Sequence, residues 1–240
     1  MRGRFSPGID CMLRVGGLTP LSSTDWPGQL SAVVFCQGCP WRCGYCHNPG
    51  LIPVQADTEI AWDEVMALLR RRQGLLDAVV FSGGEPTLQV ALPDAMREVR
   101  ALGFKIGLHT GGMYPRRLEA VLPWVDWVGL DVKAPFEAYA GVTGVDGSGA
   151  RALESLQQLL ASGVDYEVRT TVHPELLDDV ALATLARDLA ARGVKRYVVQ
   201  AFRPQGCQDA KLCATATRTR SLHETSNDFA GLFDDFSVRG

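Results

Sequence analysis

Residues 33–49, Val-Val-Phe-Cys-Gln-Gly-Cys-Pro-Trp-Arg-Cys-Gly-Tyr-Cys-His-Asn-Pro, decide the fold of this chain, because an apolar run ends there directly in a loop of cysteines. The stretch holds four of the seven cysteines, and Cys39, Cys43 and Cys46 follow one another with three and then two residues between them. One tight loop can therefore turn three thiolates toward a common point. Soft thiolates in such a cage suit zinc, copper(I) or an iron-sulfur cluster.

The number of cysteine ligands narrows the choice among these metal centres. A structural zinc site takes a fourth ligand, and a cubane cluster bound by protein alone normally takes a fourth cysteine. Cys36 lies too few residues upstream to close the same cage comfortably, and no second cysteine pair follows at zinc-ribbon spacing. A cluster with one open coordination position is typical of a site that does chemistry. The alternatives are a structural zinc site or three unrelated core thiols.

Length and composition are compatible with one α/β domain over residues 1–240 and a substantial core, because the chain is 46% hydrophobic. A net charge of −3 argues against a protein whose main task is binding nucleic-acid phosphates. Residues 1–7 lack the apolar core of a signal peptide, and no later run approaches membrane-spanning length. We expect a cytoplasmic protein without a membrane partner, where clustered cysteines are more often metal ligands or catalytic groups than disulfides.

Short β-branched runs alternate with helical periodicity along the chain. The expected strands are residues 30–35, 78–81, 104–108, 125–130, 166–172 and 196–200, and the helical patterns between them cover 62–69, 92–99, 115–121, 153–160 and 182–189. Six such units predict a parallel sheet with right-handed crossovers, that is, a (βα)6 partial TIM barrel. Residues 141–149 are expected to form a flexible loop. A polar tail covers about 214–240, within which 229–238 could add a short helix and an edge strand.

Polar and glycine residues stand where the expected strands end. In barrels and open parallel sheets, sites form at the carboxyl ends of the strands. The residues at those positions, in chain order, are the cysteine loop at 36–49, then Gly83, Gly84 and Glu85, then His109 and Thr110, then Asp131 and Lys133, then Arg169 and Gln200.

Several of these residues also have a purely structural interpretation. In that interpretation, Gly83 and Gly84 simply form a tight turn at the end of a strand. Asp131 and Lys133, whose side chains face the same side, simply form a surface ion pair. His109 can be a satisfied structural histidine.

Three further residues fall outside this set. His47 is expected to support the metal centre from outside the ligand shell. Cys207 and Cys213 lack nearby partners in the sequence, and Cys11 could join them only through a fold-back. We therefore expect structural or spare thiols there, not an auxiliary cluster.

The cysteine loop resembles the cluster loop of the radical S-adenosylmethionine (SAM) superfamily. The flanking segments, Ser-Thr-Asp-Trp-Pro-Gly at 23–28, Cys-Gln-Gly-Cys at 36–39 and Tyr-Cys-His-Asn-Pro at 45–49, resemble the glycyl-radical-enzyme activases. Within that group they are most similar to the activating proteins of anaerobic ribonucleoside-triphosphate reductase. Those families usually carry another residue where this chain has Cys36, so the resemblance assigns no role to Cys36.

The resemblance implies a set of cofactor contacts. Cys39, Cys43 and Cys46 would hold a 4Fe-4S cluster whose open iron chelates SAM through its amino and carboxylate groups. The segment Gly83, Gly84 and Glu85 would receive the SAM amino group through backbone carbonyls. Lys133 and Arg169 would meet the SAM carboxylate or ribose, and Asp131 would organise that edge. Thr110 and Gln200 complete the expected cofactor-binding set.

The implied activity is that of an anaerobic radical SAM oxidoreductase. An external one-electron donor, such as flavodoxin or ferredoxin, would reduce the cluster, reductive cleavage of SAM would give a 5′-deoxyadenosyl radical, and this radical would take a hydrogen from a glycine of a partner enzyme. Three alternatives stay open. They are a radical SAM enzyme acting on a small molecule, similar to 7-carboxy-7-deazaguanine synthase, a peptide-modifying radical enzyme, and a non-enzymatic zinc module.

Overall fold

The computed structural model describes residues 12–57 and 59–240, and its described strands form one open sheet in the order β1 to β8. The strands are β1 (Val15–Ser22), β2 (Ser31–Cys36), β3 (Ala78–Gly83), β4 (Lys105–Thr110), β5 (Trp127–Asp131), β6 (Asp165–Val172), β7 (Arg196–Ala201) and β8 (Asp235–Arg239). The pair β1 and β2 is antiparallel, and every later neighbouring pair is parallel. Because β2 to β8 are parallel, their carboxyl ends meet at one edge of the sheet.

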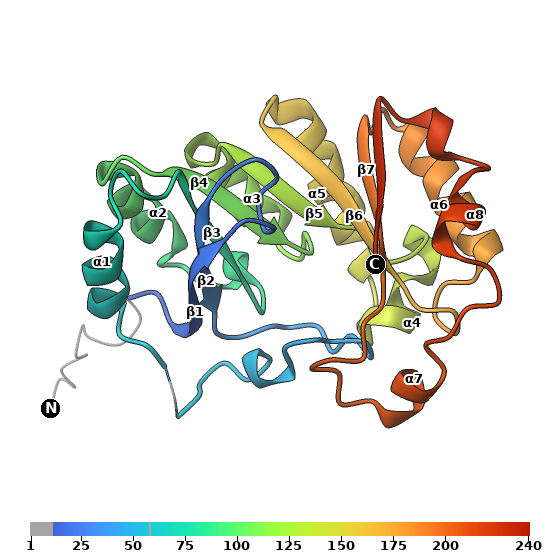
Figure 1. The fold of residues 1–240 in the computed structure, drawn as a ribbon, viewed down its shortest axis with the longest axis horizontal. Coiled ribbons are helices and arrows are strands. Elements are labelled where there is room, and N and C mark those ends of the chain that lie inside the picture. The colour runs from blue at the N-terminus through green and yellow to red at the C-terminus, as the bar shows by residue number, and fades with distance from the viewer. Residues whose placement is uncertain (1–11, 58) are drawn as a thin grey trace, which may run out of the picture.

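Helices connect the successive parallel strands. The crossovers contain α1 (Trp62–Arg71), α2 (Leu92–Ala101), α3 (Pro115–Val121), α4 (Tyr139–Thr143), α5 (Ser148–Ser162) and α6 (Asp179–Ala191), while α7 (Ala210–Ala214) and α8 (Leu222–Ser226) precede β8. Figure 1 shows α1, α2, α3, α5 and α6 following one another along the outside of the curved sheet. The predicted α/β partial barrel is confirmed. No helix in the described ranges is long and apolar enough to cross a membrane.

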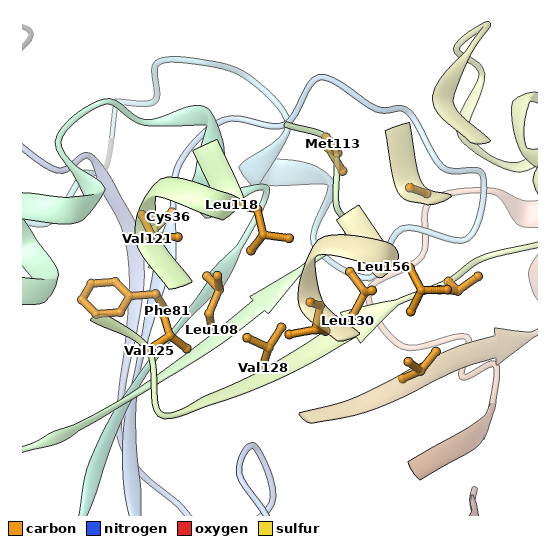
Figure 2. Packing of buried hydrophobic residues seen from close by; sticks show 14 of the residues in the cluster. Cys36, Phe81, Leu108, Met113, Leu118, Val121, Val125, Val128, Leu130 and Leu156 are labelled. Carbon is orange, nitrogen blue, oxygen red and sulfur yellow. The ribbon is translucent and has the colours of Figure 1, made fainter. Parts of the chain in front are cut away.

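The two faces of the sheet bury different side chains, because successive residues of a strand point to opposite faces. Val34 of β2 packs into the main core under the helices, whereas Val33 belongs to a separate inner cluster. Figure 2 shows part of the main core, where Leu118 of α3 lies over Leu108 of β4 and Leu130 of β5. The inner cluster consists of Trp26, Val33, Ala78, Val80 and Trp127, with Phe35 packed against it.

One strand was missed by the sequence analysis, which placed the first strand at 30–35. The antiparallel strand β1 precedes it, with the sequence Val-Gly-Gly-Leu-Thr-Pro-Leu-Ser. Two glycines and a proline hide its periodicity. Pro20 is tolerated because it falls in a register irregularity between Thr19 and Ser22, on a strand at the edge of the sheet.

The loop expected at 141–149 is shorter than predicted, because only residues 144–147 lie between α4 and α5. Gly141 lies in α4, and Gly149 lies in the first turn of α5. A Cβ at Gly149 would stand 1.8 Å from the carbonyl oxygen of Phe136, so glycine lets the helix approach that backbone closely. The short helix and edge strand expected within 229–238 are confirmed as a 3-10 turn at Ala230–Leu232 and strand β8.

Candidate active site

The cysteine loop leaves β2 and is fastened to the chain that follows it. Gly38 N donates to the carbonyl oxygen of Leu51 at 2.8 Å, and Cys39 N donates to that of Ile52 at 3.0 Å. The buried Gln37 side chain adds bonds from its Nε2 to the carbonyl oxygens of Gly50 at 3.0 Å and Pro53 at 2.7 Å. These bonds close residues 37–53 into a loop whose backbone is held at both ends.

The two glycines at the end of β3, Gly83 and Gly84, permit close contact with this loop. A Cβ at Gly84 would lie 2.3 Å from the carbonyl oxygen of Gly38, and a Cβ at Gly83 would lie 2.5 Å from the Cys36 nitrogen. Gly83 also has a φ of 110°, which side chains rarely adopt. A branched residue at position 84 would therefore displace the cysteine loop itself, in addition to any effect on a bound cofactor.

One cavity at the carboxyl ends of the strands gathers most of the expected site residues. Its volume is about 200 Å³, somewhat below the roughly 300–1,000 Å³ that is usual for small-molecule sites. Its lining includes the expected residues Cys39, Cys43, Cys46, His47, Gly83, Gly84, His109, Thr110, Asp131, Lys133 and Arg169. Glu85, Gln200 and Cys36 do not line it.

The three thiols fit a multi-iron cluster better than a single metal ion. Burial raises the pKa of Cys39 to about 12 and also raises the pKa of Cys43, so a bound metal must displace the protons. Three cysteines of one loop suit a four-iron cluster, which distributes its cysteines over separate irons, whereas a structural zinc ion takes four protein ligands.

Three charged side chains form the opposite wall. Arg169 Nε donates to Asp131 Oδ1 at 3.0 Å, and Lys133 Nζ donates to Oδ2 of the same carboxylate at 3.4 Å. Burial raises the pKa of Asp131, but the positive charges of Arg169 and Lys133 outweigh it and lower that pKa to about 2. Two cations face one anion, so this wall carries an excess positive charge that suits a carboxylate ligand.

His109 supports the wall from beneath as a neutral ring. Its Nε2 lies 2.7 Å from the carbonyl oxygen of Asp25 and 3.1 Å from Arg169 Nη1, and its Nδ1 lies 3.2 Å from Ser82 Oγ. The Asp25 carbonyl can only accept and the Arg169 guanidinium can only donate, so the two contacts require opposite protonation of Nε2, and a neutral ring makes only one of these two hydrogen bonds at a time. Burial and the neighbouring Arg169 lower the pKa of His109 to about 3.

Glu85 lies beneath the cavity lining and holds the segment after β4. Its fully buried carboxylate accepts from Thr110 Oγ1 at 2.7 Å, from Gly111 N at 3.0 Å and from Thr87 N at 3.0 Å. Burial raises the pKa of Glu85, and these donors partly offset that rise. The geometry gives Glu85 a positioning role toward Thr110. Gln200 is half-buried on β7, paired in register with Thr171, which does line the cavity.

Several site residues were absent from the sequence analysis. Tyr139 of α4 fixes the end of β5, because its hydroxyl accepts from Lys133 N at 3.0 Å and donates to the Asp131 carbonyl at 3.2 Å. Nothing in the local sequence marks this tyrosine. Tyr45 and Asn48 also line the cavity and belong to the cysteine loop named above, whereas the sequence analysis did not single out the lining residues Ile52, Ser82, Gly111, Met113 and Thr171.

Comparison with known proteins gives consistent results. The family model of the radical SAM superfamily matches residues 33–186. A Methanocaldococcus jannaschii protein named for glycyl-radical enzyme activation is 29% identical over 205 residues, 81% of this chain and 82% of that protein. The pyruvate formate-lyase-activating enzyme of Clostridium pasteurianum is 31% identical over 174 residues, 70% of this chain and 71% of that enzyme.

Solved structures show the same fold. The crystal structure of Streptococcus suis SuiB bound to precursor peptide SuiA superposes with a TM-score of 0.66 at 13% identity. The match covers 87% of this chain and 48% of SuiB, so this chain spans about half the length of that protein. A likeness at this level of identity concerns the fold alone.

Proposed function

This chain belongs to the radical SAM superfamily and, within it, to the glycyl-radical-enzyme activating enzymes, and we propose that it installs a glycyl radical on an anaerobic ribonucleoside-triphosphate reductase. One observation carries the proposal of a SAM-dependent site. Three thiols of a single loop share one cavity with a glycine pair and with a cationic wall on two neighbouring strands.

The thiols of Cys39, Cys43 and Cys46 would hold the 4Fe-4S cluster. When bound, the cluster supplies the electron that cleaves the sulfonium of SAM and so generates the radical that takes the glycine hydrogen. The backbone at Gly83 and Gly84 would approach the SAM amino group closely, because no side chain stands in the way.

The cationic wall would bind the SAM carboxylate. Lys133 and Arg169 share Asp131, so each cation is held in place while donors remain free for a ligand. His109 stays uncharged at neutral pH, so it adds no further charge beside Arg169. Thr110 would border the cofactor at a position fixed by Glu85.

The sheet leaves room for a macromolecular partner. In the described residues, β1 and β8 are the two ends of the strand order and do not pair, so the partial barrel is open along one side. A loop of a large enzyme needs such an opening to reach the cavity. The segments at 23–28 and 36–49, with their resemblance to ribonucleotide reductase activating proteins, support that reductase as the partner. The Clostridium relative supports a pyruvate formate-lyase as the second candidate.

The test is an anaerobic activation assay with each candidate partner. The cluster-loaded protein, reduced by flavodoxin or ferredoxin, is mixed with SAM and with either the reductase or the lyase of the same organism. We expect 5′-deoxyadenosine and, with the reductase, a doublet from a glycyl radical in electron paramagnetic resonance. The Cys43→Ala variant serves as the control and should give neither signal.

Other outcomes assign the function differently. A doublet only with the lyase would select that partner. Formation of 5′-deoxyadenosine without a radical on either protein would contradict the activase proposal and favour a small-molecule substrate. A colourless protein that binds zinc stoichiometrically and no iron would contradict both.

A further inference from the structure

The segment that follows β7 packs directly on the cysteine loop. A Cβ at Gly206 would stand 2.2 Å from the carbonyl oxygen of His47, and a Cβ at Gly44 would stand 3.2 Å from the side chain of Leu212. The rings of Phe202 and His47 are stacked with 5.6 Å between their centroids. Residues 202–214 therefore form a cover over the part of the loop between Cys43 and His47, although more than 150 residues separate the two segments in sequence.

This cover carries two cysteines around one turn. Cys207 Sγ donates to the carbonyl oxygen of Gly44 at 3.6 Å, and Cys213 Sγ lies 3.8 Å from the carbonyl oxygens of both Cys207 and Pro204. Both thiols are free and only partly buried. Cys213 Sγ thus lies against the backbone of Cys207, and Cys207 in turn contacts the residue that follows Cys43.

The two cysteines lie close together within residues 202–214, with Cys213 Sγ 3.8 Å from the Cys207 carbonyl oxygen. Cys11 lies outside the described residues. The described part of the chain offers them no third Cys, His, Asp or Glu with which to form a metal site. The chemistry left to two adjacent, partly exposed thiols is oxidation to a disulfide.

We propose that Cys207 and Cys213 are a redox-active dithiol that closes to a disulfide when the protein meets a low-molecular-weight disulfide. One of the two thiolates attacks a sulfur of the oxidant, which forms a mixed disulfide and releases one small thiol. The other thiolate then attacks the protein sulfur of that mixed disulfide, forms the intramolecular disulfide and releases the second small thiol. The cysteine pair loses two electrons and two protons, and the oxidant is reduced to two thiols.

Closing the disulfide changes a contact of the cysteine loop. The oxidised Cys207 has no S–H, so the carbonyl of Gly44 loses its thiol donor. This carbonyl belongs to the residue between Cys43 and Tyr45, so the oxidation state of the pair acts on the backbone beside an expected cluster ligand. The pair is a modification site separate from the thiols that line the cavity, because neither Cys207 nor Cys213 lines it.

Peptide mapping of the full, cluster-loaded chain tests the proposal. The protein is treated anaerobically with oxidised glutathione, free thiols are alkylated, and the product is digested with trypsin, which separates Cys207 from Cys213 by cleavage after Lys211. We expect a disulfide-linked pair of peptides that an added dithiol separates. The Cys207→Ser and Cys213→Ser variants should each keep their iron and carry one glutathione on the remaining thiol.

Two results would overturn the proposal. One is a wild-type protein in which both thiols carry glutathione and no linked peptide forms. The other is a linked peptide that joins Cys207 or Cys213 to Cys39, Cys43 or Cys46. Iron content is measured on the same samples, so loss of the cluster is distinguished from failure of the dithiol. Peptide mapping of the disulfide does not require radical formation, so it tests the dithiol even if the protein forms no glycyl radical on a partner.

Discussion

The two ends of the barrel interior are built by the same strands and have opposite character. Within five residues, strand β5 passes from the apolar end of the barrel interior to the charged end, and its residues Trp127, Gly129 and Asp131 all point inward. Trp127 stacks on Trp26 with 5.5 Å between ring centroids and closes one end with apolar contacts. Asp131 stands at the other end, in the cavity wall with Lys133 and Arg169. Gly129, between them, leaves room for the Arg169 guanidinium, which a Cβ would meet at 2.8 Å.

The difference shows how the site is made rigid. The segment between β1 and β2 folds into the barrel, places Trp26 in the closed end and presents the Asp25 carbonyl to His109. Because the closed end excludes water, the charges above it interact through protein of low polarity and hold one another firmly. Stability is thus concentrated at one end and chemistry at the other, and substitutions should separate the two.

The largest expected effect is at the open end. Replacing Cys39, Cys43 or Cys46 by Ala should abolish cluster assembly while leaving the midpoint of urea unfolding of the cluster-free protein nearly unchanged, because the site has no spare ligand. Iron and sulfide are counted after anaerobic reconstitution. Cys36→Ala is the matched control and should keep the cluster, since Cys36 is fully buried in the main core and does not line the cavity. Loss of iron in the Cys36 variant would contradict the ligand assignment.

The next effect belongs to the closed end. Trp127→Ala should lower the free energy of unfolding by about 3–5 kcal/mol, the usual cost of truncating a buried aromatic residue. Trp124, which is 36% exposed and three residues earlier, provides the control, and Trp124→Ala should change stability by only about 0.5 kcal/mol. Urea unfolding of the cluster-free proteins measures both. Equal losses in the two variants would mean that the inner cluster does not stabilise the barrel.

A smaller effect is expected for the cationic wall. Lys133→Ala and Arg169→Ala should each weaken SAM binding by roughly 1.5–3 kcal/mol, as for a lost charge-assisted hydrogen bond, while the cluster stays intact. Isothermal titration of the reconstituted variants gives the affinities. Arg196→Ala removes an exposed cation from the neighbouring strand β7 and should leave the affinity unchanged. If both wall variants bind SAM as the wild type does, these residues serve structure alone.

The smallest effect is a pH dependence of stability set by His109. Its pKa is about 3 in the folded chain and about 6.5 when unfolded, so between these values the unfolded chain binds more protons and stability falls as pH falls. From pH 6.5 to 5 this amounts to at most about 2 kcal/mol. The His109→Gln variant lacks this titration. The wild-type advantage over it should therefore shrink toward acid pH, and a constant difference would contradict a buried neutral ring.

Most of the fold was predictable because its signals are local. The apolar runs of β2 and β3 and the helical spacing of Trp62, Val65 and Leu69 follow directly from periodicity. Strand β1 was not predictable in this way, since its glycines and Pro20 are acceptable only because β2 pairs along it as a long-range partner.

The sequence by itself determined which residues stand at the carboxyl ends of the strands, because that placement depends only on chain order within a parallel sheet. Which of these residues face one cavity depends on the tertiary structure. Glu85 lies below the cavity and accepts a hydrogen bond from Thr110. Tyr139, which comes from helix α4, accepts a hydrogen bond from the backbone of Lys133. The same holds for Cys207, which contacts Gly44 of the cysteine loop across more than 150 residues. Long-range contacts of this kind depend on side-chain packing between distant segments, so they cannot be predicted from a local sequence pattern.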